Sequence, residues 1–255
     1  WSSDVCSSDL PDPRVLGAHR RQHLRLASPA YLESLQRLAD GTIRLLTLSA
    51  EIDGAFDLIR AARSLGIAVS IGHSWATAEQ LASARDAGAC ALTHFGNAIP
   101  QTLPRHDNPL WASLATAGLT ALLVVDGLHV PRSFVQAVVR TMGLASVALV
   151  SDSAPLTGLP PGDYQVFEQS VQLRADGAIW NSEEQHFCGS SSSLLEVVNR
   201  ALEWGIVDVQ GAWELAYHNP LALIGLSHCL WHSDERVILA EGQNRFDVVS
   251  TKLTR

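Results

Sequence analysis

Apolar and polar positions alternate along most of this chain in a way that predicts strand-then-helix units. The apolar runs predict strands over residues 43–49, 67–72, 90–94, 120–126 and 147–152. Helical spacing of apolar positions covers residues 54–66, 78–88 and 133–143. In the first of these, Phe56, Ile59 and Ala62 share one face, and Gly66 is expected to end the helix. This order of elements is typical of a parallel sheet in an α/β fold.

Side chains suited to chemistry stand where the predicted strands end. His73 and His94 end two consecutive strands, Asp126 and His129 follow the next, and Asp152 ends a fourth. Ligands collect at the carboxyl ends of parallel strands, so these residues could share one metal ion of the kind used in hydrolysis. Taken singly, each has a simpler explanation, because a histidine can be structural and an aspartate can cap a helix.

An alternative assigns the chemistry to Ser74. The segment from Gly72 to Ala76 is close to the Gly-x-Ser-x-Gly pattern of a serine hydrolase. That reading needs Asp152 with His186 or His218 as partners, and a glycine-rich oxyanion loop that the sequence does not contain. It also leaves His94, Asn97 and His129 without a role. The metal reading is therefore favoured, and Ser74 is expected to help start the following helix.

Composition narrows the class of partner. The net charge of -8 over 255 residues argues against nucleic acid or an anionic membrane surface. No apolar run reaches the roughly 18 residues of a membrane-spanning helix, and no signal peptide opens the sequence. The four cysteines form no CxxC pair, which argues against a disulfide framework or a structural zinc site. A cytoplasmic protein with a small-molecule substrate is expected.

Eight segments together resemble one known family, the N-acetylglucosamine-6-phosphate deacetylases of the metal-dependent amidohydrolase superfamily. They are GAH (17–19), LSAE (48–51), GHSWAT (72–77), THFGNA (93–98), VDGLHV (125–130), VSDSAPLTG (150–158), FCGSSSSL (187–194) and NPLALIGL (219–226). The patterns GHS-x-AT, TH-x-x-NA and DG-x-H are highly specific in combination. The resemblance extends from Pro11 to the end of the sequence.

The resemblance implies a (β/α)₈ TIM-type barrel with a small β domain built from both ends of the chain. Residues 11–230 would form part of the barrel, and residues 231–255 would be the C-terminal remnant of the small β domain. The opening ten residues, WSSDVCSSDL, look like translated sequencing adapter and are treated as non-native. The chain is thus expected to be truncated at its amino-terminal side.

The resemblance also implies roles for particular residues. His73 and His94 would bind one divalent metal ion, zinc in the first place, with iron or cobalt as alternatives. Asp152 would be the general base and acid. Substrate contacts would come from Ala18, Asn97, Ala98, His129, Cys188, Gly189 and Ser190. The implied reaction is hydrolysis of the acetamide of an N-acetylated amino sugar, N-acetylglucosamine 6-phosphate above all, and a homodimer is a further implication.

Two departures from the family pattern keep alternatives open. The family's third metal ligand is a glutamate that would fall within residues 1–10, where no glutamate exists. Weak metal retention and little activity are therefore expected of the chain as it stands. Asp107 occupies the position of the arginine that accompanies a 6-phosphate, with Arg105 and His106 nearby, and an acid there would repel phosphate. A non-phosphorylated N-acyl or cyclic amide substrate, or an inactive sugar-binding fragment, remain the other candidates.

Overall fold

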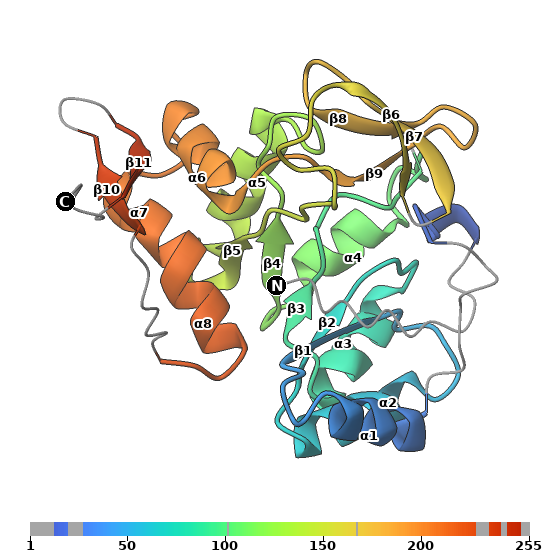
Figure 1. The fold of residues 1–255 in the computed structure, drawn as a ribbon. Coiled ribbons are helices and arrows are strands. Elements are labelled where there is room, and N and C mark those ends of the chain that lie inside the picture. Colours follow the sequence, from blue (N-terminus) through green and yellow to red (C-terminus); the bar gives the residue numbers. More distant parts are fainter. Residues whose placement is uncertain are drawn as a thin grey trace.

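A curved parallel sheet of five strands forms the centre of the computed structural model (Figure 1), which describes residues 13–19, 28–100, 102–166, 168–227, 235–240 and 244–250. The strands lie side by side in chain order. They are β1 (Leu45–Leu48), β2 (Ala68–Ile71), β3 (Ala91–Leu92), β4 (Thr120–Leu123) and β5 (Val147–Leu149). Each neighbouring pair is parallel, so the predicted parallel α/β sheet is confirmed.

Helices cover the outer face of this sheet, and the apolar spacing predicted three of them, at residues 54–66, 78–88 and 133–143. The covering helices are α1 (Pro29–Leu38), α2 (Ala55–Ser64), α3 (Ala78–Ala87), α4 (Pro109–Ala115), α5 (Arg132–Met142) and α6 (Leu194–Glu203). The predicted end of α2 is confirmed, because Gly66 follows with a φ of +73°. A short η1 turn (Pro13–Val15) precedes these elements, and η3 (Leu144–Ser146) leads into β5.

The main core lies between the sheet and these helices. Leu58 and Ile59 on α2, with Leu46 on β1, are each at most 1% exposed. Burying one such aliphatic side chain contributes about 1.5–3 kcal/mol relative to leaving it in water. The opposite face of the sheet carries a smaller cluster around Ala91, Leu122 and Ala148. The strands are therefore buried on both sides, as expected for a parallel sheet flanked by helices.

A second sheet, which the sequence patterns did not predict, lies beyond the carboxyl ends of the parallel strands (Figure 1). Its four antiparallel strands are β6 (Gly162–Val166), β7 (Gln169–Leu173), β8 (Ala178–Asn181) and β9 (His186–Ser190). Two backbone hydrogen bonds tie it to the segment after β5: Ser190 N donates to Asp152 O at 2.8 Å, and Ala154 N donates to Ser190 O at 2.8 Å. The small sheet therefore borders the site at the strand ends.

The C-terminal part holds three further short helices and a hairpin. The helices are α7 (Val209–Trp213), the π-helical turn η4 (Glu214–His218) and α8 (Asn219–Leu223). The hairpin pairs β10 (Glu235–Leu239) with β11 (Phe246–Ser250) and is attached to α6 where Asn199 bonds the backbone of Phe246. Residues 231–234, 241–243 and 251–255, like residues 1–10, lie outside the described part.

None of the helices in the described ranges is long and apolar enough to span a membrane.

Candidate active site

Sheet register brings the first two predicted metal ligands level with each other. Ile71 on β2 is paired with Leu92 on β3, so His73 and His94 each stand two residues beyond a matched pair. Their backbones leave the strands in the left-handed region, with φ of +48° for His73 and +31° for His94, and Asp152 after β5 has +50°. Left-handed non-glycine residues are uncommon and cluster at functional sites. Here they mark three of the strand ends.

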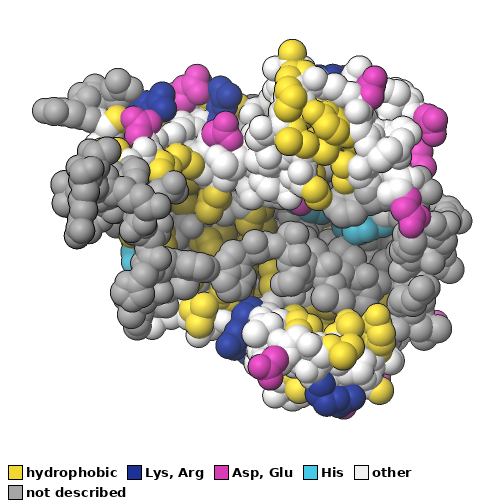
Figure 2. Space-filling model, in the orientation of Figure 1, with side chains coloured by type: hydrophobic (Ala, Val, Ile, Leu, Met, Phe, Trp, Pro, Cys, Tyr) yellow, Lys and Arg dark blue, Asp and Glu magenta, His cyan; other side chains and the backbone are white. Residues whose placement is uncertain are grey.

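The two imidazoles meet at their Nε2 atoms, which are 3.0 Å apart. A third imidazole joins them from the segment after η1, because His19 Nε2 lies 3.3 Å from His73 Nε2. Figure 2 shows histidine side chains in a recess beneath the small sheet. The sequence analysis included His19 in the GAH segment but gave it no role, because it lies in no predicted strand or helix.

Burial and hydrogen bonding fix the protonation state of His73. Its Nδ1 donates to the carbonyl of Val15 at 2.9 Å, so the Nε2 lone pair of the neutral ring points toward His94. Desolvation, then repulsion from His94 and His19, lowers the pKa of His73 well below 6.5. Burial likewise lowers the pKa of His94 to about 4. Both rings are therefore neutral at pH 7, the form that binds a metal ion.

These features fit a divalent metal ion, although the ligand set is small. Nδ1 of His94 is buried and has no hydrogen-bond partner, the one such side-chain atom found among the residues described. A buried polar atom without a partner is uncommon and needs an explanation, such as a bound ion nearby. Within the same residues, no group of three or more His, Cys, Asp or Glu side chains is arranged to hold a metal. The structure thus supplies part of a site around His73 and His94.

Residues at the end of β1 hold the Gly-His-Ser turn in place by hydrogen bonds. The hydroxyl of Ser74 donates to one carboxylate oxygen of Glu51, and the other oxygen accepts from Trp75 N at 2.7 Å. The expectation that Ser74 helps start the following helix is therefore wrong. Ser49 Oγ donates to the carbonyl of His73 at 2.7 Å. Thr77, not Ser74, caps α3 in a capping box with Gln80. Ser74 therefore holds the turn that carries His73, and its hydroxyl is directed at a carboxylate rather than at a histidine base.

The predicted substrate residues near β3 and at 17–19 surround the same turn. A cavity of about 40 Å³ is lined by His73, Asn97 and Ala98 among others, room for about one water molecule. Asn97 Nδ2 donates to the carbonyl of His94 at 3.1 Å. Gly17 has a φ of +57°, and a Cβ there would lie 3.0 Å from Cε1 of His73, so only glycine lets this segment approach the ring. The carbonyl of Ala18 accepts from Gln169 at 2.7 Å.

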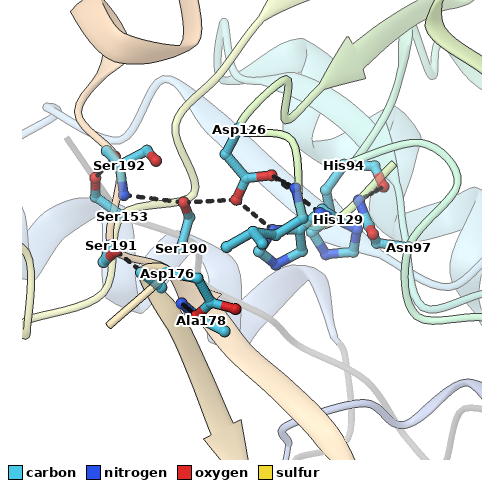
Figure 3. A network of polar contacts seen from close by, with 12 residues as sticks. His94, Asn97, Asp126, His129, Ser153, Asp176, Ala178, Ser190, Ser191 and Ser192 are labelled. Carbon is cyan, nitrogen blue, oxygen red and sulfur yellow. Dashed lines mark hydrogen bonds and ion pairs between the residues drawn. The ribbon is translucent and has the colours of Figure 1, made fainter. Parts of the chain in front are cut away.

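Asp126 and His129 form a buried pair after β4 (Figure 3). His129 Nδ1 donates to Asp126 Oδ2 at 2.6 Å, and Ser190 Oγ donates to the same oxygen at 2.9 Å. Burial raises the pKa of Asp126, but the hydrogen bonds and charge of His129 and the backbone N–H of Leu128 outweigh it and lower the pKa to about 2. The sequence placed Asp126 at a strand end; its bond to Ser190, 64 residues away, was not foreseeable.

This pair predicts a pH dependence of stability. Because the folded pKa of Asp126 is about 2 against an ordinary 3.8, its contribution is complete above about pH 4 and is lost as the pH falls toward 2. We expect the unfolding free energy to drop over that window by about 1–2 kcal/mol more than in Asp126→Asn, allowing for solvent screening. Urea unfolding at several pH values measures it. Parallel curves for the two proteins would contradict the assignment.

The predicted contacts from β9 adjoin Asp152. Gly189 has a φ of +78°, and a Cβ there would lie 3.1 Å from the carbonyl of Asp152. Cys188 is 3% exposed, and burial raises the pKa of its thiol to about 11, so it is a thiol at neutral pH. Ser190 is also buried, and its hydroxyl bonds Asp126. The structure therefore brings Gly189 and Ser190 together with Asp152 and Asp126, and Cys188 into the core of the small sheet.

The residues predicted to govern phosphate binding lie in the loop before α4. Arg105, His106 and Asp107 are all exposed. The backbone carbonyl of Arg105 accepts from Trp111 Nε1 at 3.1 Å, while its guanidinium makes no ion pair among the salt bridges of the described residues. Arg105, exposed and next to His106, is accessible for binding an anion.

Hydrolases built on parallel βα sheets place their active sites at the carboxyl ends of the strands, where this chain gathers imidazoles and carboxylates. The chain is similar to N-acetylglucosamine-6-phosphate deacetylases, as its motifs predicted. It is 30% identical to the enzyme of that name from Vibrio furnissii over 214 residues, 84% of this chain and 53% of that protein. It is 27% identical to the N-acetylgalactosamine-6-phosphate deacetylase of Escherichia coli O157:H7, over 86% of this chain and 57% of that protein.

The solved structures that are similar to this chain are also deacetylases. A Mycobacterium smegmatis N-acetyl-D-glucosamine-6-phosphate deacetylase mutant in complex with N-acetyl-D-glucosamine-6-phosphate is 25% identical, with a TM-score of 0.79 over 88% of this chain and 60% of that one. The Thermotoga maritima N-acetylglucosamine-6-phosphate deacetylase, 21% identical over 97% of this chain and 68% of that one, has the same fold at a TM-score of 0.80. No family model matches the chain. The chain spans about half the length of the curated relatives it matches.

Proposed function

We propose that the protein is a metal-dependent deacetylase that hydrolyses the acetamide of an N-acetylated amino sugar, giving the amino sugar and acetate. The observation that carries this proposal is the 3.0 Å approach of the Nε2 atoms of His73 and His94 at the ends of adjacent parallel strands. The similarity to curated deacetylases supports N-acetylglucosamine 6-phosphate as the substrate. The wider proposal is a partial (β/α)₈ barrel with a small β domain, acting in the cytoplasm, with a homodimer as its assembly.

His73 and His94 would hold one divalent ion, zinc first and iron or cobalt as alternatives. When bound, such an ion supplies Lewis-acid activation of the amide carbonyl and of water. His19 contacts His73 on the same side and offers a further nitrogen at 3.3 Å. The carbonyl of Val15, by accepting from Nδ1, keeps the Nε2 of His73 available.

Asp152 would carry the proton. Its carboxylate accepts a proton from the water that attacks the acetamide carbon, and then delivers it to the nitrogen as the C–N bond breaks. Support comes from its place at the end of β5, from its φ of +50°, and from the backbone bond of Ser190 N to its carbonyl. These features fix the turn from which its side chain projects.

The sugar and its acetyl group would be held by residues around the recess. We retain as proposed substrate contacts Ala18, Asn97, Ala98, His129, Cys188, Gly189 and Ser190. His129 would contact the acetamide, since its ring lies beside His94 (Figure 3). Cys188, being in the core of the small sheet, would act through the backbone of β9.

Phosphate recognition is proposed to depend on Arg105. Asp107 is exposed two residues away and disfavours an anion, so a non-phosphorylated N-acyl or cyclic amide substrate is the second candidate and a silent sugar-binding fragment the third. Arg105→Ala is expected to raise KM for a 6-phosphate roughly tenfold or more, through loss of a charge-assisted bond, and to leave KM for the free sugar unchanged. Equal effects on both would remove Arg105 from phosphate binding.

An amine-release assay on the zinc-loaded protein tests the function. Its substrates are N-acetylglucosamine 6-phosphate, N-acetylgalactosamine 6-phosphate, N-acetylglucosamine and a lactam, a cyclic amide whose ring opening frees an amine. Preferential amine release from N-acetylglucosamine 6-phosphate supports the proposal, and release from only N-acetylglucosamine or only the lactam supports the second candidate. Binding of the sugars in calorimetry without release from any of them would support the third.

A further inference from the structure

A buried amide of the small sheet bonds the segment that carries His19. Gln169, the first residue of β7, is 2% exposed. Its Nε2 donates to the carbonyl of Ala18 at 2.7 Å, across 151 positions of the sequence. The side chain of Ala18 also packs against the core of the small sheet. Figure 1 shows the η1 turn, which precedes Ala18, beside this sheet. Residues 17–19 are therefore attached to the small sheet at their middle residue.

The residues on either side of Ala18 lie against His73. A Cβ added to Gly17 would be 3.0 Å from Cε1 of His73. The rings of His19 and His73 have centroids 4.4 Å apart, and their Nε2 atoms are separated by 3.3 Å. Because Ala18 contacts the small sheet while both of its neighbours contact His73, the place of Ala18 sets how closely His19 approaches that ring.

The polarity of each bond in this amide network is defined by its partners. Asn181, also 2% exposed, accepts with Oδ1 from Glu183 N at 2.9 Å and from Glu184 N at 3.0 Å. Its Nδ2 then donates to Gln169 Oε1 at 2.8 Å. With its oxygen engaged as an acceptor, Gln169 turns its NH₂ group to the carbonyl of Ala18. Both amides are neutral, so the arrangement does not depend on any protonation state.

Gln169 stands where the strand pattern calls for an apolar residue. The buried positions of β7 are Gln169, Val171 and Leu173, and the last two belong to the apolar core of the small sheet. An aliphatic side chain would fill this position without the cost of burying an amide, a cost that hydrogen bonds must offset. The bond to Ala18 is what an aliphatic residue could not supply.

We propose that Gln169 is a positioning residue: by holding the carbonyl of Ala18, it fixes His19 beside His73 and makes the small sheet part of the framework of the imidazole cluster. This inference rests on the proposed function and deepens it, because hydrogen-bond partners outside a ligand set orient the groups of a metal site.

Two substitutions separate this role from packing. Gln169→Met keeps the length of the side chain but cannot donate to Ala18. Gln169→Asn keeps the amide but is one methylene too short to reach both Asn181 and Ala18, and it serves if the methionine variant does not fold. Gln165→Met is the matched control, because Gln165 is an exposed glutamine of the same sheet and donates to Ser170 Oγ at 2.6 Å.

Nuclear Overhauser effects between the ring protons of His19 and His73 measure their approach directly. The spectra are recorded on the full chain, with the signals assigned from His19→Ala and His73→Ala. We expect these effects in the unsubstituted protein and in Gln165→Met. They should be lost in Gln169→Met and Gln169→Asn, while the amide spectrum shows that both variants remain folded.

Titration with Co²⁺ tests whether this approach matters to the site. Gln169→Met should lower the Co²⁺ affinity about 10-fold, the lower end of the range for losing a partner outside the ligand set. In a His19→Ala background the same substitution should cause no further loss, since residues that act through one another have non-additive effects. A general loosening of the fold would lower the affinity equally in both backgrounds.

Persistence of the His19–His73 effects in a folded Gln169 variant would overturn the proposal. So would an unchanged Co²⁺ affinity in Gln169→Met, which would make the amide a structural contact only, or an equal loss in the His19→Ala background. The expected results without release of amine from any substrate would leave the positioning role standing and remove the deacetylase proposal. Amine release by a protein in which Gln169→Met changes neither reading would do the reverse.

Discussion

Asp152→Asn is expected to lower kcat for deacetylation by about 10² to 10⁴-fold, the usual contribution of a positioned general acid and base. The amide is nearly the same size as the carboxylate but cannot take a proton from water or deliver one to the departing amine. Asparagine also tolerates the left-handed backbone, with φ of +50°, that Asp152 adopts after β5. The turn should therefore persist, and the loss should be in the chemical step.

Steady-state kinetics with metal analysis on the same preparations measures this effect. We expect the bound metal and the KM to remain close to those of the unsubstituted protein, because His73 and His94 are untouched. Asp163→Asn, at an exposed position on β6, is the matched control for loss of one carboxylate. Full turnover by Asp152→Asn would assign the proton transfer to another group, and a loss of metal would make Asp152 a ligand instead.

The sequence predicted the parallel sheet because each unit repeats one physical pattern. Buried strands such as β2, with all four residues inside, read as continuous apolar runs, and the helices between them carry apolar residues at helical spacing. The same order placed His73 and His94 at strand ends. The two histidines lie close together because β2 and β3 are parallel and in matched register, so that both strands end at the same edge of the sheet.

The small sheet β6–β9 was not predicted, although β7 alternates buried and exposed residues. Its strands are only four or five residues long, and β8 and β9 carry an irregular register, so the alternation is short and interrupted. Its core is also completed by Ala154 and Leu156, which come from the segment after β5. Such packing depends on tertiary contacts that no local pattern contains.

Ser74 shows a different limit of local reasoning. A serine after a strand is a common helix cap, and this one stands just before α3. Thr77 is instead the N-cap of α3, because the hydroxyl of Ser74 donates a hydrogen bond to Glu51 at the end of β1. His19 was given no role for a related reason, since its partner His73 is 54 residues away in the sequence. Both outcomes were decided by contacts between distant segments.

His73→Ala is expected to weaken binding of a divalent metal by more than about 100-fold, since loss of an outer hydrogen-bond partner to a ligand already costs about 10- to 100-fold. His73 contacts both of the other imidazoles, so its removal leaves His94 and His19 without the nitrogen they share. Titration with Co²⁺, followed by visible absorption and by calorimetry, gives the affinity without reference to activity. His186→Ala is the matched control, because His186 pairs with Glu184 outside the cluster and its loss should leave the affinity unchanged. Undiminished Co²⁺ binding by His73→Ala would mean that the imidazoles at the strand ends do not share an ion. That result would contradict the proposed metal-dependent mechanism of deacetylation.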